Sequence, residues 1–215
     1  KLDLDQPIDK YLSFPKKEWS FTTRQLLGHL AGVRHYQGGG ETTSTRHYRD
    51  VASGLSTFAQ DPLLHEPGTK YHYSTFGYNL LGAIVEEVSG KSFAEYVEVR
   101  ICKPAGMSHT VVDHHFRIIP HRARGYVRPR ADRRSEVPRG LRGVLEHGEL
   151  YNAPMHDTSF KIPGGGLLST SSDLARFAMA LCDGKLLPAE RLEEMWTEQE
   201  TRTGEPTGYG LGFRL

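Results

Sequence analysis

The feature that most constrains this chain is a turn that leads, through several aromatic residues, into one long amphipathic helix. Glu66-Pro67-Gly68-Thr69 has turn composition, and Lys70-Tyr71-His72 carries the chain on to Tyr73. Beyond Tyr73 the apolar residues recur at helical spacing, and Gly90 is placed to end the helix. The apolar face is expected to consist of Leu80, Leu81, Ile84, Val85 and Val88. The segment therefore predicts a rigid helix that starts from a fixed turn at Tyr73.

The remaining pattern is also mostly helical, with little sheet. Thr22 and Gln25 have capping-box spacing, which predicts a helix over 22–30 that Gly32 stops. Further helices are expected over 92–102, closed by Pro104 and Gly106; from Thr170 up to Gly184; and over 189–196. Residues 37–45 have loop composition, and 209–213 looks like the start of a strand.

Composition excludes several classes of protein. The chain has 215 residues, 37% hydrophobic and 25% charged, as soluble globular proteins do. A net charge of +1 gives no overall field that would recruit nucleic acid or a membrane surface. No apolar run reaches the roughly 18 residues that a membrane span needs. The charged start, Lys1-Leu2-Asp3-Leu4-Asp5, is unlike a signal peptide and leads us to expect a chain cut from a longer protein.

Five collinear blocks resemble the serine β-lactamase-like family, which includes class C β-lactamases, D,D-peptidases and related esterases. The segment 67–82 resembles the family's second motif, Tyr-x-Asn before a helix, with Tyr73 at the tyrosine and Thr75 where asparagine is usual. The other blocks are 26–33, 84–90, 104–107 and the glycine-rich turn 164–170 with its helix at 173–177. Within the family, Arg34-His35-Tyr36, Arg122-Ala123-Arg124 and Lys161 resemble the serine β-lactamase-like proteins of animal mitochondria and their bacterial relatives.

The resemblance implies a mixed α/β (α+β) fold of the β-lactamase/transpeptidase type. Such a fold has a helical lobe and an antiparallel sheet flanked by helices, and this chain covers it only in part. We expect residues 1–215 to form one partial domain, mostly the helical lobe, with about 207–215 entering the sheet lobe. Gly164-Gly165-Gly166 is expected where the backbone bends tightly or approaches a neighbour closely.

The chemistry that the resemblance implies is acyl transfer to a serine. A serine hydroxyl needs a neighbouring base, and a lysine one helical turn beyond the serine favours the phenolate form of a nearby tyrosine. Tyr73 is then the expected catalytic residue, a general base that takes the serine proton. Thr75 is the expected substrate-binding residue, although its hydroxyl lacks the donor-plus-acceptor amide of asparagine. This departure favours esterase or peptidase activity over efficient β-lactam hydrolysis.

The family's other motifs have only imitations in this chain. The resemblance places a Ser-x-x-Lys upstream of residue 1 and a His-x-Gly or Lys-Thr-Gly strand downstream of residue 215. Ser13-Phe14-Pro15-Lys16 matches the first literally, but Pro15 disrupts the helical turn that would align serine and lysine. Arg202-Thr203-Gly204 imitates the third motif and precedes the expected strand, so we interpret it as a polar loop.

Three further sets of residues, the arginines, histidines and cysteines, are interpreted as having no catalytic or binding role. The arginines between 117 and 142 are diluted by prolines and acidic residues and fit a solvated loop over the rim of the site. His109, Asp113, His114 and His115 lack the spacing of a metal site, so no metal and no cofactor are expected. Cys102 and Cys182 are interpreted as small buried hydrophobic residues.

Sequence alone thus predicts a serine hydrolase that acts through an acyl-enzyme on an ester, an amide or peptide, or a β-lactam. This chain by itself is expected to be inactive. The alternative is a catalytically inactive scaffold or binding protein with a role in filaments or assembly. A small-molecule or peptide substrate is the expected partner, without nucleic acid or a membrane span, and a homo-oligomer stays open. The compartment is open too: periplasmic or extracytoplasmic for a bacterial protein, mitochondrial for an animal-like one.

Overall fold

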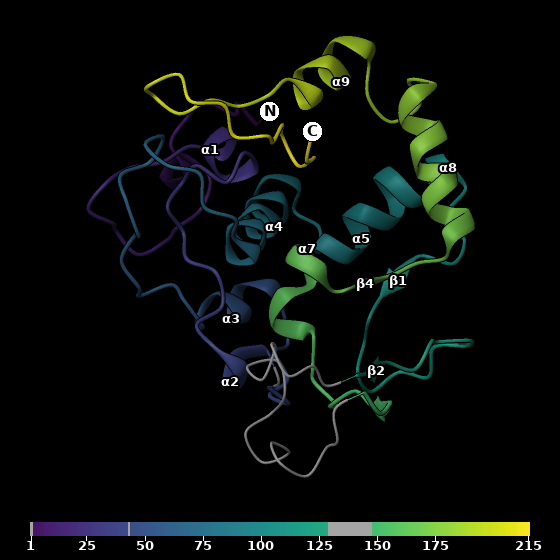
Figure 1. Cartoon of the computed structure of the whole chain (residues 1–215). Coiled ribbons are helices and arrows are strands. Elements are labelled where there is room, and N and C mark those ends of the chain that lie inside the picture. The colour runs from purple at the N-terminus through teal and green to yellow at the C-terminus, as the bar shows by residue number, and fades with distance from the viewer. Residues whose placement is uncertain (1, 43, 129–147) are drawn as a thin grey trace.

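Helix α4 (Thr75–Ser89) lies at the centre of the structure, a computed structural model that describes residues 2–42, 44–128 and 148–215 (Figure 1). The helix begins where the Ser74 hydroxyl accepts the amide hydrogen of Gly77, and it ends at Gly90 in the left-handed conformation, φ 66°. The expected helix and its glycine stop are thereby confirmed. Its inner face is fully buried at Leu80 and Ile84. Val88 was wrongly placed on that face: it is 43% exposed, because the last turn of α4 reaches past the core cluster.

Four short helices of the described residues precede α4 in the chain. They are η1 (Ile8–Lys10), α1 (Thr23–Leu27), α2 (Gly39–Thr42) and α3 (Val51–Leu55). Among them, α1 and α3 pack against α4. The capping box of Thr22 and Gln25 is present, but α1 ends at Gly28, earlier than expected, because His29 takes a left-handed φ of 58°. The loop expected over 37–45 was wrong at α2, where the Glu41 carboxylate accepts the amide hydrogen of Gln37.

One apolar cluster joins these helices to α4. Phe76 lies at its centre, stacked on Phe58 with ring centroids 4.5 Å apart and an interplanar angle of 9°. The other buried members are Ile8, Leu12, Phe21, Leu26, Ala31, Val33, Val51, Leu55, Leu80, Ala83, Ile84 and Phe160. Since burial of apolar surface is the main driving force of folding, this cluster fixes α4 and the turn before it in one position.

A second helical layer follows in α5 (Phe93–Val97), the π-helical turn η2 (Glu98–Cys102) and α6 (Lys103–Ala105). The expected helix is confirmed, but it runs past Pro104 and stops only at Gly106, φ 71°. Helix α8 (Ser171–Cys182) packs on this layer, and α9 (Ala189–Trp196) has the expected bounds. The Thr170 hydroxyl accepts the amide hydrogen of Asp173, as the sequence predicts.

The strands of the described residues form two small antiparallel sheets. Strand β1 (Val111–Val112) pairs with β4 (Leu167–Leu168), with Val111 opposite Leu168. Strand β2 (Tyr126–Val127) pairs with β3 (Tyr151–Asn152), with Tyr126 opposite Asn152. The helical turns η5 (Ser159–Lys161) and α7 (Ile162–Gly165) connect the second sheet to β4.

The strand expected at 209–213 was wrong. Tyr209 and Arg214 form an isolated antiparallel bridge around a tight turn, in which the Gly210 amide donates to the Phe213 carbonyl at 2.7 Å. Gly212, at φ 96°, allows the chain to reverse there. The glycine-rich end therefore makes a hairpin-like turn in place of an extended strand.

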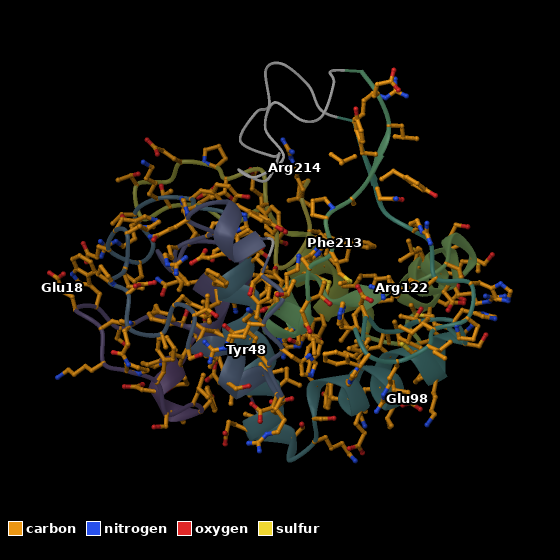
Figure 2. The ribbon with its side chains drawn as sticks, turned by 90° about the horizontal axis from the view of Figure 1, so that it is seen from below. Glu18, Tyr48, Glu98, Arg122, Phe213 and Arg214 are labelled. Atoms are coloured by element: carbon orange, nitrogen blue, oxygen red, sulfur yellow. The ribbon has the colours of Figure 1, made fainter. Side chains whose placement is uncertain are left out.

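The first residues and α9 lie at the same end of the molecule (Figure 1). Arg24 joins them, because its guanidinium pairs with Asp5 at 2.6 Å and with Glu194 at 2.9 Å. In the view of Figure 2, the exposed Glu18 and Glu98 mark opposite sides of the helical body. Of the helices in the described ranges, none is both long and apolar enough to cross a bilayer.

Candidate active site

Tyr73 lies directly before α4 and is 49% exposed. Its ring packs against two histidine rings, with centroid distances of 4.4 Å to His29 and 5.5 Å to His35. Within the described residues, no hydrogen bond is formed by the Tyr73 hydroxyl. The phenol is therefore held by its ring while its oxygen stays available.

The residue after Tyr73 fixes the turn. The Ser74 hydroxyl donates to the Arg34 carbonyl at 2.6 Å and accepts the Gly77 amide hydrogen at 3.0 Å. Arg34 is itself buried, and its guanidinium is paired with Glu41 and Asp61. Because a buried, fully paired arginine has little freedom, the turn at Ser74 is tied to a rigid part of the core.

Thr75 is buried beneath the glycine-rich turn, only 6% exposed. A Cβ atom at Gly164 would lie 2.5 Å from Thr75 Cγ2 and 2.6 Å from the Thr75 carbonyl oxygen. The Asn79 amide holds this approach, since it accepts from the Gly164 amide at 3.2 Å and donates to the Phe160 carbonyl at 2.8 Å. The close approach predicted for the glycine-rich turn is confirmed at Gly164, whose neighbour is Thr75, and at Gly166, whose neighbour is Ile162.

Several titratable groups surround Tyr73 and Thr75. Burial raises the pKa of Tyr36, and a hydrogen bond with the Thr75 side chain opposes this shift. Lys161 lies beside the same ring, with Nζ 5.8 Å from the Tyr36 centroid, and burial lowers the pKa of its ammonium. Burial also lowers the pKa of His35, and the nearby His72 adds to the shift. All three shifts have burial as their largest cause, and burial favours the neutral form of each group.

The other side of Tyr73 is an aromatic cluster centred on His29. Its ring lies 5.9 Å from that of Tyr71, 5.1 Å from that of Tyr78 and 4.7 Å from that of Tyr209. Burial is the main cause that lowers the pKa of His29 to about 4, so the ring is neutral at pH 7. Tyr209 belongs to the C-terminal turn, which therefore packs onto the site.

Sequence reasoning brought Tyr73 and Thr75 to one place but missed the groups that hold them. His29, His35 and Ser74 were not singled out as site residues. Ser74 carried a signal, because serine directly before an apolar helical pattern is a favoured N-cap. The histidines carried none beyond their position in blocks that resemble the family, since their contacts join segments far apart in the chain.

The motif imitations have no place in this site. Ser13 and Lys16 are exposed on a non-helical stretch, so they do not form the Ser-x-x-Lys turn. Arg202 lies in the turn between Glu200 and Pro206 and pairs with Glu66 at 2.6 Å, which confirms a polar loop.

The arginines, histidines and cysteines considered in the sequence lie partly within the residues that the structure describes. Of the arginine cluster, Arg122 pairs with Asp113 at 2.6 Å (Figure 2 labels Arg122). Arg130, Arg133, Arg134, Arg139 and Arg142 lie outside the described residues. His114 Nδ1 accepts the Phe116 amide hydrogen. The prediction for the cysteines was right for Cys102, which is buried, and wrong for Cys182, which α8 exposes at its last turn.

Known proteins with similar sequences or structures are named as beta-lactamase-like proteins, penicillin-binding proteins and amidases. Serine beta-lactamase-like protein LACTB, mitochondrial, of Homo sapiens is 29% identical over 92% of this chain and 48% of its own length. D-amino acid amidase from Ochrobactrum anthropi SV3 in complex with L-phenylalanine superposes with a TM-score of 0.73 and 28% identity, over 90% of this chain and 54% of that chain. An octameric penicillin-binding protein homologue from Pyrococcus abyssi superposes with a TM-score of 0.71 and 25% identity, over 98% of this chain and 47% of that chain.

These similarities confirm the expected fold type, mixed α/β of the β-lactamase/transpeptidase kind, and the resemblance to the mitochondrial subgroup. The chain spans about half the length of the curated relatives it matches. The sequence model described as Beta-lactamase matches residues 1–215. The chain therefore belongs to the beta-lactamase family.

Proposed function

We propose that the full-length protein is a serine hydrolase that forms an acyl-enzyme, with Tyr73 as its general base. The observation that carries the proposal is the setting of Tyr73: a half-exposed phenol on a hydrogen-bonded turn at the head of a helix whose inner face is buried. A general base needs such fixed geometry, since its oxygen must meet the proton within hydrogen-bond reach. The family and the penicillin-binding and amidase neighbours support this class of chemistry.

The roles follow from the chemistry of the groups. Tyr73 takes the proton of the serine hydroxyl while the serine oxygen bonds to the substrate carbonyl carbon. The same proton then passes to the leaving alcohol or amine as its bond to that carbon breaks, and water later hydrolyses the acyl-enzyme. The serine is proposed to come from a Ser-x-x-Lys motif of the full-length protein.

Thr75 is proposed to shape the substrate preference. Its methyl group lies under Gly164, and threonine has a hydroxyl but no amide to offer a substrate. We therefore propose that the enzyme prefers esters, amides and peptides over β-lactams. The substrate is proposed to be a small molecule or a peptide. Turnover of an aryl ester should exceed that of nitrocefin in the full-length protein. Nitrocefin turnover far above that of aryl esters would contradict the assignment for Thr75.

Covalent labelling tests the proposed function. The full-length protein is treated with a fluorophosphonate or penicillin probe, and its labelled serine is identified by mass spectrometry. Tyr73→Phe should slow labelling by about 100-fold or more, because it removes the group that takes the proton. Tyr126→Phe is the matched control, since Tyr126 is an exposed tyrosine on β2. Labelling of Tyr73→Phe at the wild-type rate would show that Tyr73 does not activate the serine.

The alternative, an inactive scaffold, makes the opposite forecast. A protein that kept the fold for assembly alone would take up neither probe, with or without Tyr73. Self-association does not separate the two, because a penicillin-binding protein homologue of this fold is itself octameric. We propose that a homo-oligomer of this protein is compatible with catalysis.

A further inference from the structure

His29 holds the backbone on both sides of Tyr73. Its carbonyl oxygen accepts the amide hydrogen of His72 at 2.8 Å, and its ring Nδ1 accepts that of Ser74 at 3.2 Å. The two amides flank Tyr73, and the same imidazole packs against the Tyr73 ring at 4.4 Å. One residue thus restrains the Tyr71–His72 peptide, the Tyr73–Ser74 peptide and the Tyr73 ring that lies between them.

His35 extends the restraint by one residue. Its Nδ1 accepts the amide hydrogen of Thr75 at 3.2 Å, and its ring meets the Tyr73 ring nearly edge-on, at an interplanar angle of 76°. The amides of Ser74 and Thr75 come at the start of α4, where a helix has no internal acceptors for them. Two imidazoles therefore supply the acceptors at consecutive positions.

These bonds fix the protonation of both rings. A backbone N–H only donates, so each Nδ1 must carry a free lone pair, and the proton of the neutral ring must sit on Nε2. A protonated imidazolium has no lone pair and releases the amide. Charged and titratable groups also face the rings: Tyr71, Tyr73, Tyr78, Tyr209, His35 and His72 around His29; and Tyr36, Tyr73, Glu41, His72 and Lys161 around His35.

Stability alone gives His29 little reason to be a histidine. Its Nε2 is buried with no hydrogen-bond partner among the described residues, and its φ of 58° is left-handed. An unpaired buried N–H and a left-handed non-glycine residue each cost free energy. Residues with such costs cluster at functional sites. For His29 the compensating interactions are the two amide hydrogens that it accepts, from His72 and Ser74.

We infer that His29 and His35, through Nδ1, are positioning residues that hold the segment 72–75 so that the Tyr73 oxygen keeps one place. The inference rests on the proposed function, because the position of Tyr73 matters only if Tyr73 acts in the reaction. Neither histidine needs to touch the substrate. Each acts through the backbone beside the base.

The tautomer tests the geometry without any activity. Long-range ¹⁵N–¹H correlation spectra of the histidine rings in the full-length protein at pH 7 should show both His29 and His35 with the proton on Nε2 and none on Nδ1. His29→Phe and His35→Phe assign the two signals by their loss. A proton on Nδ1 of His29 would overturn the inference, because that atom could not accept the Ser74 amide.

Two complementary variants of His29 test its effect on the reaction. His29→Phe keeps an aromatic ring against Tyr73 but has no acceptor, whereas His29→Asn keeps an acceptor oxygen at the δ position and tolerates a left-handed φ. We expect kcat for an aryl ester to fall about 10- to 100-fold in His29→Phe, with little change of KM, and to stay within a few-fold of wild type in His29→Asn. His109→Gln is the matched control, since the ring of the exposed His109 forms a hydrogen bond with its neighbour Ser108, outside this segment.

Combination with Tyr73→Phe separates positioning from general damage to the fold. If His29 acts through Tyr73, His29→Phe should lower the rate no further in a Tyr73→Phe background. An equal loss in both backgrounds would overturn the inference and leave the base assignment standing. If Tyr73→Phe alone kept the wild-type rate, the proposed function of Tyr73 would be wrong, whatever the His29 variants show. If His29→Phe does not fold, His35→Phe and His35→Asn make the same comparison at Thr75.

Discussion

Protonation of His29 should be coupled to unfolding at acid pH. Its pKa is about 4 in the folded chain, below the value of about 6.5 of a free histidine, because burial opposes the charged form. Between these two values the unfolded chain binds more protons than the folded one. The free energy of unfolding must therefore fall as the pH falls through this window, and it is constant above about pH 6.5 in this respect.

The expected loss is measurable by urea unfolding. Between pH 7 and pH 5, His29 should account for up to about 2 kcal/mol of the decrease in unfolding free energy of the full-length protein. His29→Asn lacks the titrating ring and should lose correspondingly less over the same interval. Parallel pH curves for the two proteins would show that the imidazole is not held neutral by the fold.

Only some residues of the candidate site can be predicted from the sequence. Tyr73 is predictable because it stands at a fixed offset from a turn and a helix, and Thr75 because it occupies a motif position. His29 is not, because its role depends on a contact with Ser74 across 45 residues of chain. No local pattern encodes a hydrogen bond of that kind, whereas Ser74 itself follows from N-cap chemistry.

At the scale of elements, the contact between α7 and α4 is what encloses Thr75. Gly164→Ala should lower the free energy of unfolding by about 1–3 kcal/mol, because the added methyl group would meet Thr75 Cγ2 and backbone at 2.5–2.6 Å. Gly40→Ala is the control, since a Cβ there meets nothing within 4 Å. Equal stability of the two variants, measured by thermal or urea unfolding, would mean that α7 can move away from α4 without cost.

Element boundaries follow from sequence where their signals are local. Helix α9 and the start of α8 follow from Pro188 and from the Thr170–Asp173 pair, and α4 ends at Gly90 as expected. Helix α1 is shorter than its capping box predicts, because the left-handed His29 ends it in favour of the contacts beside Tyr73. Helix α2 escapes prediction because Glu41 is fixed by Arg34, a tertiary interaction.

On the scale of the whole molecule, the described elements form one helical body with two small sheets at its side. Tyr209, near the end of the chain, packs on His29, near its beginning, so the site is assembled from distant segments. The fold type could be predicted from collinear blocks that resemble the family. The hairpin-like turn at Tyr209–Arg214 could not, because Gly210 and Gly212 permit both a strand and a reversal, and packing selects the reversal.

Tyr73 is proposed to be the base for acylation in the full-length protein. The most direct measurement is the single-turnover rate constant for acylation by an aryl ester, compared between wild type, Tyr73→Phe and Tyr126→Phe. We expect a fall of about 100-fold or more in Tyr73→Phe alone, with the folded state of all three proteins unchanged. An acylation rate in Tyr73→Phe equal to that of wild type would contradict the proposal.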